Sequence, residues 1–234
     1  MMEELFARTI SLLGKDNASK LANAKVMVIG CGAVGGYALE CIARLGVGNI
    51  VVVDFDCFEN SNVNRQILAL KDTIGKKKCD VARDRVLAIN PMANVKSFDL
   101  RIDSEHLDFI SDEKPDFVVD AIDDVVAKCD LIEYLVSHDV KFVSAMGAAL
   151  KFKPELLKVA TLDKTSSCRL AKKLRDILSK RRVDLKKVKC VYSSEAVKVC
   201  KDEFGNNVLG SLVMVPMAMG ANLAYVVFNG LLED

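Results

Sequence analysis

The segment that most constrains the fold of this 234-residue chain is 26–36, VMVIGCGAVGG. A Val-rich run that ends in Gly-x-Gly-x-x-Gly and continues as a helix is typical of a dinucleotide-binding turn. In such a turn Gly30 permits a tight bend, Gly32 lets the backbone approach a phosphate, and Gly35 lets the helix pack closely on the strand. The helix start offers unpaired N–H groups to an anion. The spacing alone does not distinguish a nicotinamide dinucleotide from ATP.

Apolar, Val- and Ile-rich runs alternate with helix-period segments after this turn. Strands are expected at 25–29, 49–54, 94–100, 117–121 and 141–144, and helices at 34–45, 76–89 and 125–137. Strands that alternate with helices imply right-handed crossovers and a mostly parallel sheet covered on both faces. The sequence therefore predicts an α/β fold with a Rossmann-like, doubly wound sheet.

The length suits a single domain over residues 1–234. An N-terminal helical extension is expected at 1–24, and a C-terminal elaboration at 151–234. Within the elaboration we expect a strand at 156–162, a basic helix at 168–182, a strand at 189–192 and a flexible break around 201–207.

The stretch 208–232 has no charged residue and is long enough to cross a bilayer. Glycine, proline and asparagine interrupt it, however, and neither flank carries a basic cluster or an aromatic belt. An apolar helix can also be packed inside a large core. We expect a buried terminal helix or helix pair, without stable membrane insertion.

Composition excludes some classes of function. The 33 Lys and Arg residues balance 32 Asp and Glu residues, so the overall charge makes no case for a nucleic-acid partner. The eight cysteines form no Cys-x-x-Cys pair, which argues against a structural zinc site. The N-terminus lacks the features of a signal peptide, and reduced cysteines then indicate a cytoplasmic protein.

Polar residues after the second expected strand discriminate between the two nucleotides. Asp54 ends that strand, where a carboxylate accepts hydrogen bonds from the hydroxyls of an unphosphorylated ribose. A loop follows where a dehydrogenase would normally begin a crossover helix. The polar residues of this loop are Asp56, Asn62, Asn64, Arg65 and Gln66, and its Arg and amide side chains suit phosphate oxygens. Lys78 opens the next helix and either adds positive charge there or is a solvated lysine in a charge run.

Asp123 lies just past the fourth of these strands, at the sheet edge where open α/β folds place their ligands. A carboxylate that faces a triphosphate can hold Mg²⁺. Asp120 and Asp124 are close competitors, although Asp124 is better explained as a helix N-cap.

The motifs GCGAVGG, VDFDCFENSNVNRQ, GKKKCDVARDRVLAINP and VVDAIDD resemble those of the ubiquitin-activating-type, ThiF/MoeB-like adenylating superfamily. FARTISLLG, NRQILAL, DAIDDVVAK and CVYSSEA are most similar to its tRNA threonylcarbamoyladenosine dehydratase branch. The resemblance implies ATP-dependent adenylation of the carboxylate of threonylcarbamoyladenosine in tRNA, followed by cyclising dehydration. It also implies Mg²⁺, and these ATP ligands: Gly32, Ala33, Asp54, Asp56, Asn62, Arg65, Lys78 and Asp123. Ala33 departs from the two adjacent glycines common in the family.

The resemblance further implies a homodimer, in which Arg8 reaches the phosphates bound by the neighbouring subunit; the alternative is an ordinary surface arginine. Cys190 is either a nucleophile that takes the acyl group or a buried strand cysteine. A cysteine desulfurase or sulfur-acceptor protein as a further partner, and a monovalent cation as a further ligand, stay open.

The basic segment 169–189 concentrates positive charge that the chain as a whole lacks. It is either a helix with a solvated basic face or a contact surface for tRNA phosphates. The residues expected to make such contacts are Lys172, Lys173, Arg175, Arg181 and Arg182.

Three other classes of protein are alternatives. An adenylyltransferase that activates the C-terminal glycine of a small sulfur-carrier protein would share the adenylating core. An NAD-dependent oxidoreductase is disfavoured by the polar loop and by the lack of an evident catalytic histidine, since only His106 and His138 are present. A non-catalytic binding domain would not be expected to keep four residues together: Asp54, Arg65, Lys78 and Asp123.

Overall fold

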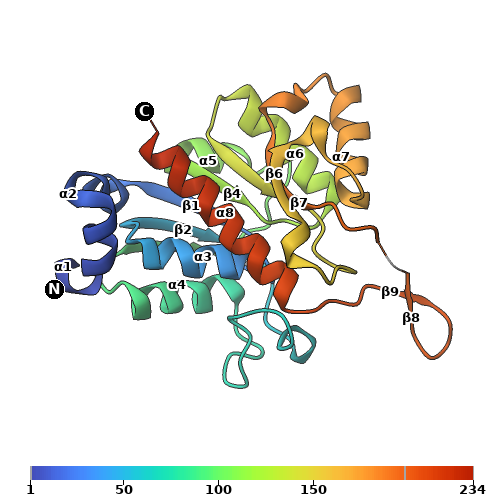
Figure 1. Ribbon diagram of the computed structural model, residues 1–234, viewed down its shortest axis with the longest axis horizontal. Coiled ribbons are helices and arrows are strands. Elements are labelled where there is room, and N and C mark those ends of the chain that lie inside the picture. The colour runs from blue at the N-terminus through green and yellow to red at the C-terminus, as the bar shows by residue number, and fades with distance from the viewer. Residues whose placement is uncertain (1, 198, 234) are drawn as a thin grey trace.

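The computed structural model describes residues 2–197 and 199–233 and contains a seven-stranded sheet of order β3-β2-β1-β4-β5-β7-β6 (Figure 1). All neighbouring strands are parallel except β6, which pairs antiparallel with β7 at the edge. The strands are β1 (Lys25–Ile29), β2 (Asn49–Val53), β3 (Asn94–Phe98), β4 (Phe117–Asp120), β5 (Phe142–Ala145), β6 (Leu157–Thr161) and β7 (Lys189–Ser193). The predicted doubly wound α/β fold is confirmed.

The helices follow the expected alternation. They are α1 (Met2–Leu5), α2 (Ala7–Asn23), α3 (Gly35–Leu45), α4 (Lys78–Ile89), α5 (Asp108–Glu113), α6 (Val125–Ser137), α7 (Arg169–Lys180) and α8 (Met214–Leu232). Short 3₁₀ turns lie at η1 (Asn60–Asn62), η2 (Pro154–Leu156), η3 (Leu162–Lys164) and η4 (Leu185–Lys187). The sequence pattern predicts neither α5 nor the break in α2 at Gly14, where φ is 80° and ψ is 163°.

Two apolar cores lie on opposite faces of the sheet, because successive strand side chains point to opposite sides. Val26 and Val28 of β1 pack into the core shared with α3, α4 and α8. Met27 and Ile29 of the same strand pack into the core shared with α6 and α7. Burial of both faces explains why β1 and β2 read as nearly continuous apolar runs.

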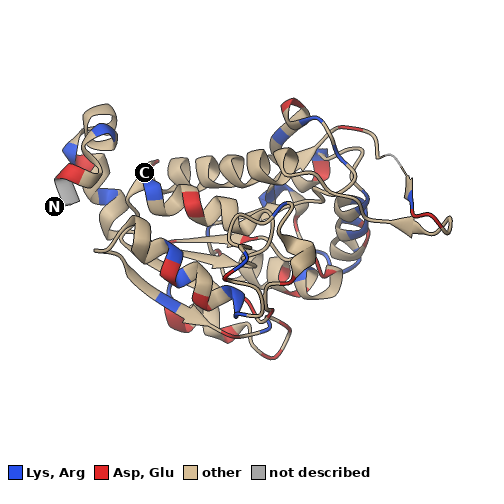
Figure 2. Cartoon of the chain, turned by 90° about the horizontal axis from the view of Figure 1, so that it is seen from below, with Lys and Arg blue, Asp and Glu red and all other residues tan. Residues whose placement is uncertain are grey.

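The uncharged C-terminal stretch forms one helix, α8, that crosses the sheet beside α3 (Figure 1). A Cβ on Gly220 would lie 2.6 Å from the Cβ of Tyr37, so this glycine sets the close approach of the two helices. No charged residue interrupts α8 (Figure 2). Among the described residues α8 is the one helix long and apolar enough to span a membrane, and 44% of its apolar stretch is buried within the protein.

The segment around 201–207, where a flexible break is expected, contains regular structure. A two-stranded ribbon of β8 (Cys200–Lys201) and β9 (Asn207–Val208) projects there from the body of the protein (Figure 1). Its turn is built by Asp202, whose carboxylate accepts hydrogen bonds from the backbone N–H groups of Phe204 at 2.9 Å and Asn206 at 2.8 Å. Gly205 supplies the positive φ of 82°.

Candidate nucleotide site

A cavity of about 480 Å³ opens at the carboxyl ends of the parallel strands. Loops that follow β1, β2, β4 and β5 line it, as expected for an open α/β sheet. The structure brings together there nine of the predicted ligands, namely Gly30, Gly32, Ala33, Asp54, Asp56, Arg65, Gln66, Lys78 and Asp123. These residues come from separate segments of the chain, and the fold alone makes them neighbours.

The three glycines of the turn have different physical roles. Gly30 has a φ of 91°, and a Cβ on it would lie 2.8 Å from the carbonyl oxygen of Ala121. A Cβ on Gly35 would lie 1.8 Å from the carbonyl oxygen of Gly30, so any side chain there would disrupt the strand-to-helix packing. Around Gly32, by contrast, the nearest atom to such a Cβ is Gln66 Nε2 at 4.0 Å. The fold therefore requires Gly30 and Gly35, whereas Gly32 leaves space on the cavity side.

Asp54 is buried at the end of β2, and backbone N–H groups contact both of its carboxylate oxygens. Oδ2 accepts from the Cys31 N–H at 2.6 Å, and Oδ1 accepts from the Asp56 N–H at 2.9 Å. Burial raises the pKa of Asp54 above its ordinary value, and it outweighs the two N–H bonds and nearby Lys78, which lower it. Each carboxylate oxygen retains acceptor capacity for a ribose hydroxyl.

Lys78, the first residue of α4, is only 8% exposed, so its interpretation as a solvated lysine is wrong. Its Nζ lies 3.1 Å from Asp56 Oδ2 and 5.9 Å from the centroid of the Phe58 ring. This ion pair holds the ammonium group at the cavity wall. The Lys78 ammonium group is therefore already oriented to interact with a phosphate in the cavity.

Arg65 and Gln66 follow the short turn η1. Arg65 Nη1 donates to the carbonyl oxygen of Ser61 at 2.6 Å and to Asn64 Oδ1 at 3.0 Å, which fixes the guanidinium beside the cavity. Gln66 is buried, and its Oε1 has no hydrogen-bond partner within the described protein. A buried unpaired polar atom is costly. Because Gln66 also lines the cavity, a polar ligand there could supply the partner.

Asn62 does not join the predicted ligands, and this part of the expectation requires correction. Its Oδ1 accepts from the backbone N–H of Glu59 at 3.1 Å, and it closes a reciprocal cap on η1. Asn62 is buried and is absent from the cavity lining. Its amide is used to shape the loop that presents Arg65.

The three acidic residues after β4 have separate roles. Asp123 is exposed and lines the cavity. Asp124 caps α6, as expected, since its Oδ1 accepts from the N–H groups of Val126 at 2.9 Å and Ala127 at 3.0 Å. Asp120 is fully buried and forms an ion pair with Lys128 at 2.9 Å. Asp124 also lines the cavity, but its Oδ1 is used by the cap and its Oδ2 accepts from Arg101 at 3.3 Å, so Asp123 is the better placed of the three to act on a ligand.

No cluster of three or more His, Cys, Asp or Glu side chains that could hold a metal occurs among the described residues. Magnesium at nucleotide sites commonly takes one or two protein carboxylates together with phosphate oxygens and water. Asp123 at the cavity edge fits that pattern without further protein ligands.

Cys190 lies in β7, where its side chain is fully buried and its Sγ donates to the carbonyl oxygen of Ala160 at 3.4 Å. Burial raises the pKa of the Cys190 thiol to about 12. The cysteine does not line the cavity. The placement matches the buried strand cysteine and argues against the acyl-carrier role, which would need an accessible thiolate.

The basic segment divides into two groups. Arg181 pairs with Asp130 at 2.6 Å and Glu133 at 2.9 Å on α6, and Arg175 donates to Thr165, so both of these arginines make internal contacts. The other three, Lys172, Lys173 and Arg182, are exposed. Ala171, Leu174 and Leu178 bury the opposite side of α7. Arg8 is exposed on α2, outside the cavity lining.

The C-terminal segment also reaches this site, which no sequence pattern indicates. Leu209, Ser211 and Pro216 form part of the cavity wall. Asn64 Nδ2 donates to the carbonyl oxygen of Ser211 at 3.2 Å and ties the segment to the Arg65 loop. A contact between residues so far apart in the chain leaves no local signal.

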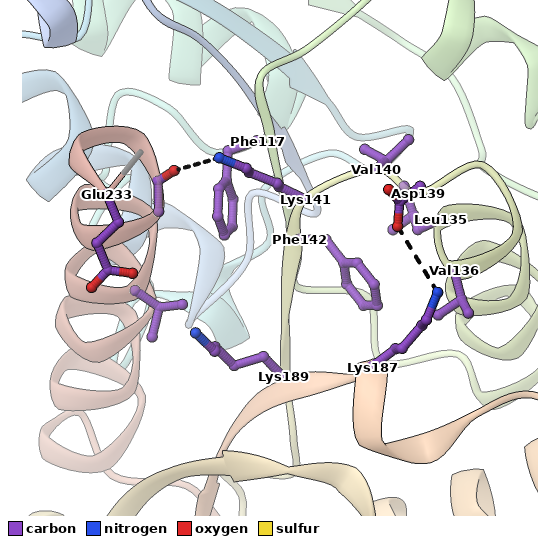
Figure 3. Close-up of a pocket in the computed structure, with 12 residues that line it drawn as sticks. Phe117, Leu135, Val136, Asp139, Val140, Lys141, Phe142, Lys187, Lys189 and Glu233 are labelled. Carbon is purple, nitrogen blue, oxygen red and sulfur yellow. Dashed lines mark hydrogen bonds and ion pairs between the residues drawn. The ribbon is translucent and has the colours of Figure 1, made fainter.

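A second cavity, of about 420 Å³, lies at the opposite edge of the sheet, where β4, β5 and β7 begin (Figure 3). Lys141 donates to the carbonyl oxygen of Gly230 at 3.2 Å, and Lys187 lies 4.0 Å from Asp139. Lys141 thus bonds a carbonyl in the last turn of α8, where a helix favours cations, whereas Lys187 lies near a carboxylate just beyond α6. None of the predicted site residues lines this cavity.

The comparisons with known proteins agree with this site. The ThiF family matches residues 6–227. The tRNA threonylcarbamoyladenosine dehydratase of Bacillus subtilis (strain 168) is 35% identical over 198 residues, which cover 85% of this chain and 78% of that protein. The namesake from Escherichia coli (strain K12) is 34% identical over 198 residues, which cover 82% and 74% of the respective chains.

Solved structures extend the likeness to three dimensions. The E. coli tRNA N6-threonylcarbamoyladenosine dehydratase in complex with ATP superposes with a TM-score of 0.90 at 30% identity, and the match covers 98% of this chain and 94% of that one. The same enzyme in complex with AMP gives a TM-score of 0.91. The chain therefore belongs to the ThiF family, and within it to the group of tRNA threonylcarbamoyladenosine dehydratases.

Proposed function

We propose that this protein uses ATP to activate the carboxylate of N6-threonylcarbamoyladenosine in tRNA and then closes that side chain into a ring with net loss of water. One observation carries the proposal: the chain matches an ATP-bound dehydratase over 98% of its length. The cavity supports it, because its lining suits an adenosine and a row of phosphates. Such an enzyme is expected in the cytoplasm, where its tRNA substrate is found.

Activation comes first, because an oxide is a poor leaving group from a carboxylate and AMP is a good one. A carboxylate oxygen attacks the α-phosphorus of ATP, the bond from that phosphorus to the bridging oxygen breaks, and pyrophosphate leaves. An amide nitrogen of the same side chain then attacks the activated carbonyl carbon. The carbon–oxygen bond to AMP breaks as the ring closes, and the nitrogen loses its proton.

The cavity residues provide stabilisation for the first step. Asp54 would accept the ribose hydroxyls, and the N–H groups that begin at Gly32 would face the phosphates. Arg65 and Lys78 would offset the negative charge that gathers at the α-phosphate. Magnesium, held by Asp123 and phosphate oxygens, would supply further positive charge.

A homodimer is the proposed assembly, and two features support it. Apolar side chains remain exposed along the outer side of α8, including Met214 at 40%, Met217 at 45% and Tyr225 at 57%. Such a continuous uncharged face is typical of a protein–protein contact. Arg8 is exposed on α2, as a residue that reaches a partner's phosphates must be.

The dimer can be tested by subunit complementation. Arg8→Ala and Asp123→Ala proteins, each inactive alone, should recover up to about a quarter of the activity when mixed, since about half of the dimers are then mixed and each mixed dimer contains one intact site of two. Absence of recovery, with dimers present by light scattering, would show that Arg8 does not act across subunits.

The function itself is tested by incubating the protein with ATP, Mg²⁺ and threonylcarbamoylated tRNA. Mass spectrometry of the digested tRNA should show a nucleoside lighter by one water, and AMP and pyrophosphate should form in equal amounts. A parallel incubation with a Gly-Gly-ended sulfur-carrier protein addresses the alternative activity. Formation of a carrier adenylate with unchanged tRNA would reject the proposal.

A further inference from the structure

Lys128 of α6 and Asp120 of β4 form a charged pair in the interior, behind the cavity. Both side chains are fully buried, and Lys128 Nζ lies 2.9 Å from Asp120 Oδ1. Lys128 Nζ also donates to the carbonyl oxygen of Ile122 at 2.9 Å. Asp120 Oδ2 accepts from Ser144 Oγ of β5 at 2.7 Å, and its Oδ1 accepts from the Ile122 N–H at 3.2 Å.

A buried ion pair of this kind contributes little to stability. Removal of both charges from water offsets most of their attraction, and well-packed neutral side chains often replace such a pair without loss. The neighbours of Lys128 on α6, Cys129, Leu131 and Ile132, are buried in the apolar core on that face of the sheet. A neutral pair would suit that environment, so stability alone does not account for the charges.

The pair instead forms hydrogen bonds with the backbone of the loop that leads to Asp123. Both the N–H and the carbonyl oxygen of Ile122 are bonded within it, one by each partner. Ala121, Ile122 and Asp123 all line the cavity. The preceding peptide is tightly confined as well, because the Ala121 carbonyl oxygen occupies the space where a Cβ on Gly30 would lie.

We propose that Lys128 is a positioning residue: its pair with Asp120 fixes the Ile122 peptide, and this fixes Asp123 at the phosphate end of the cavity. The inference rests on the proposed function for the role of Asp123. Lys128 does not line the cavity, so it acts through the loop and touches no substrate. Without the pair, the loop would sample other conformations and the first chemical step would slow.

The test uses the full-length double variant Lys128→Met/Asp120→Asn, which removes both charges and leaves side chains of similar size. We expect a melting temperature within a few degrees of wild type. The kcat for tRNA-dependent AMP release should fall by about tenfold or more, while the KM for ATP changes by less than about threefold, because adenosine contacts are intact. Hydrogen exchange of the peptide that contains residues 121–124 should accelerate.

A matched control is Arg85→Met/Glu40→Gln, which removes another charged pair, 2.8 Å apart, that lies away from the cavity. It should retain the wild-type kcat and the wild-type exchange at 121–124. The proposal is overturned if the Lys128 double variant keeps both wild-type kcat and slow exchange. It is equally overturned if that variant fails to fold, because the pair would then be a stability element.

Failure of the proposed function would look different. Wild-type protein would release no AMP with threonylcarbamoylated tRNA, yet the exchange rates at 121–124 would still report whether Lys128 holds the loop.

Discussion

The Asp54 carboxylate accepts a hydrogen bond of 2.6 Å from the backbone N–H of Cys31, the residue between the first two glycines of the turn. This bond links Asp54, the residue proposed to bind the ribose, to the turn proposed to bind the phosphates. The Asp54 side chain thus fixes the position of the glycine turn relative to the end of β2. Ionised Asp54 is the stronger acceptor, so its protonation state bears on the whole turn.

Nucleotide affinity should depend on pH through Asp54. Burial raises the pKa of this carboxyl above its ordinary 3.8, so it becomes protonated on acidification earlier than an exposed aspartate. We expect ATP affinity to weaken as pH falls through this raised pKa. Calorimetric titration with ATP over a pH series measures the effect, and Asp54→Asn should bind weakly and without that pH dependence. An unchanged pH profile in the Asn variant would assign the titration to another group.

Asp54 also affects how the free energy of unfolding depends on pH. Its effect is opposite to that of an ion-paired carboxylate, whose pKa is lowered by folding. Because the pKa of Asp54 is higher in the folded protein than in the unfolded chain, its stabilising contribution is fully present below pH 3.8 and is lost as pH rises through the folded pKa. Ionised Asp54 therefore costs some stability at neutral pH, where the proposed ribose contact uses the ionised form.

Gly32 and Gly35 should respond differently to substitution by alanine. Gly35→Ala places a Cβ 1.8 Å from the Gly30 carbonyl oxygen and should destabilise the protein by about 2 kcal/mol or more. Gly32→Ala meets nothing closer than 4.0 Å, so the melting temperature should be retained. ATP affinity should fall by about tenfold, or 1.4 kcal/mol, because the methyl group occupies phosphate space. Thermal melts and ATP titrations of both variants would separate fold from binding.

Cys190→Ser should make product at a rate within about twofold of wild type. The thiol is buried and its pKa is raised to about 12, so almost no thiolate exists at neutral pH. A serine hydroxyl can keep the bond to the Ala160 carbonyl oxygen. The measurement is the rate of nucleoside dehydration, and a loss of more than about a hundredfold with an unchanged melting temperature would restore the nucleophile hypothesis.

Exposed lysines of α7 should contribute to tRNA binding. Lys172→Glu/Lys173→Glu, combined with Arg182→Glu, should weaken binding and reduce the dependence of log affinity on log salt by roughly 1 for each phosphate that is no longer neutralised. Filter binding at several salt concentrations gives this slope. Arg181→Gln serves as control, because Arg181 pairs with Asp130 and Glu133; we expect a stability loss below about 1 kcal/mol and unchanged binding. Equal binding by the triple variant would identify α7 as a solvated face.

Regular elements could be predicted because their signals are local. The strand at Lys25–Ile29 and the helix at Val125–Ser137 have the expected bounds. The helix α4 ends at Ile89, as expected from Pro91. The ribbon at 200–208 was missed because polar residues and a glycine make up most of that segment. Its turn depends on one carboxylate, that of Asp202, which accepts hydrogen bonds from the backbone N–H groups of Phe204 and Asn206.

Site residues could be predicted where the type of side chain indicates its chemical role. They could not be predicted where contacts with distant residues give the side chain a different role. Asp54 and Arg65 face the cavity as expected. Asn62, equally suited to phosphate by type, caps its own turn instead. Lys128 looks like any helix lysine in sequence, since only packing against Asp120 reveals that it is fully buried.

The α8 contact with α3 has a consequence for biosynthesis. The core on that face joins Val26 and Val28 of the first strand to Leu223 and Val227 of the last helix. Chains emerge N-terminus first, so the nucleotide-binding half is complete long before α8 leaves the ribosome. Throughout that interval the part of α3 that α8 covers in the folded protein stays exposed. The nascent chain therefore exposes this apolar surface, which favours aggregation, until α8 has been synthesised and packs on it.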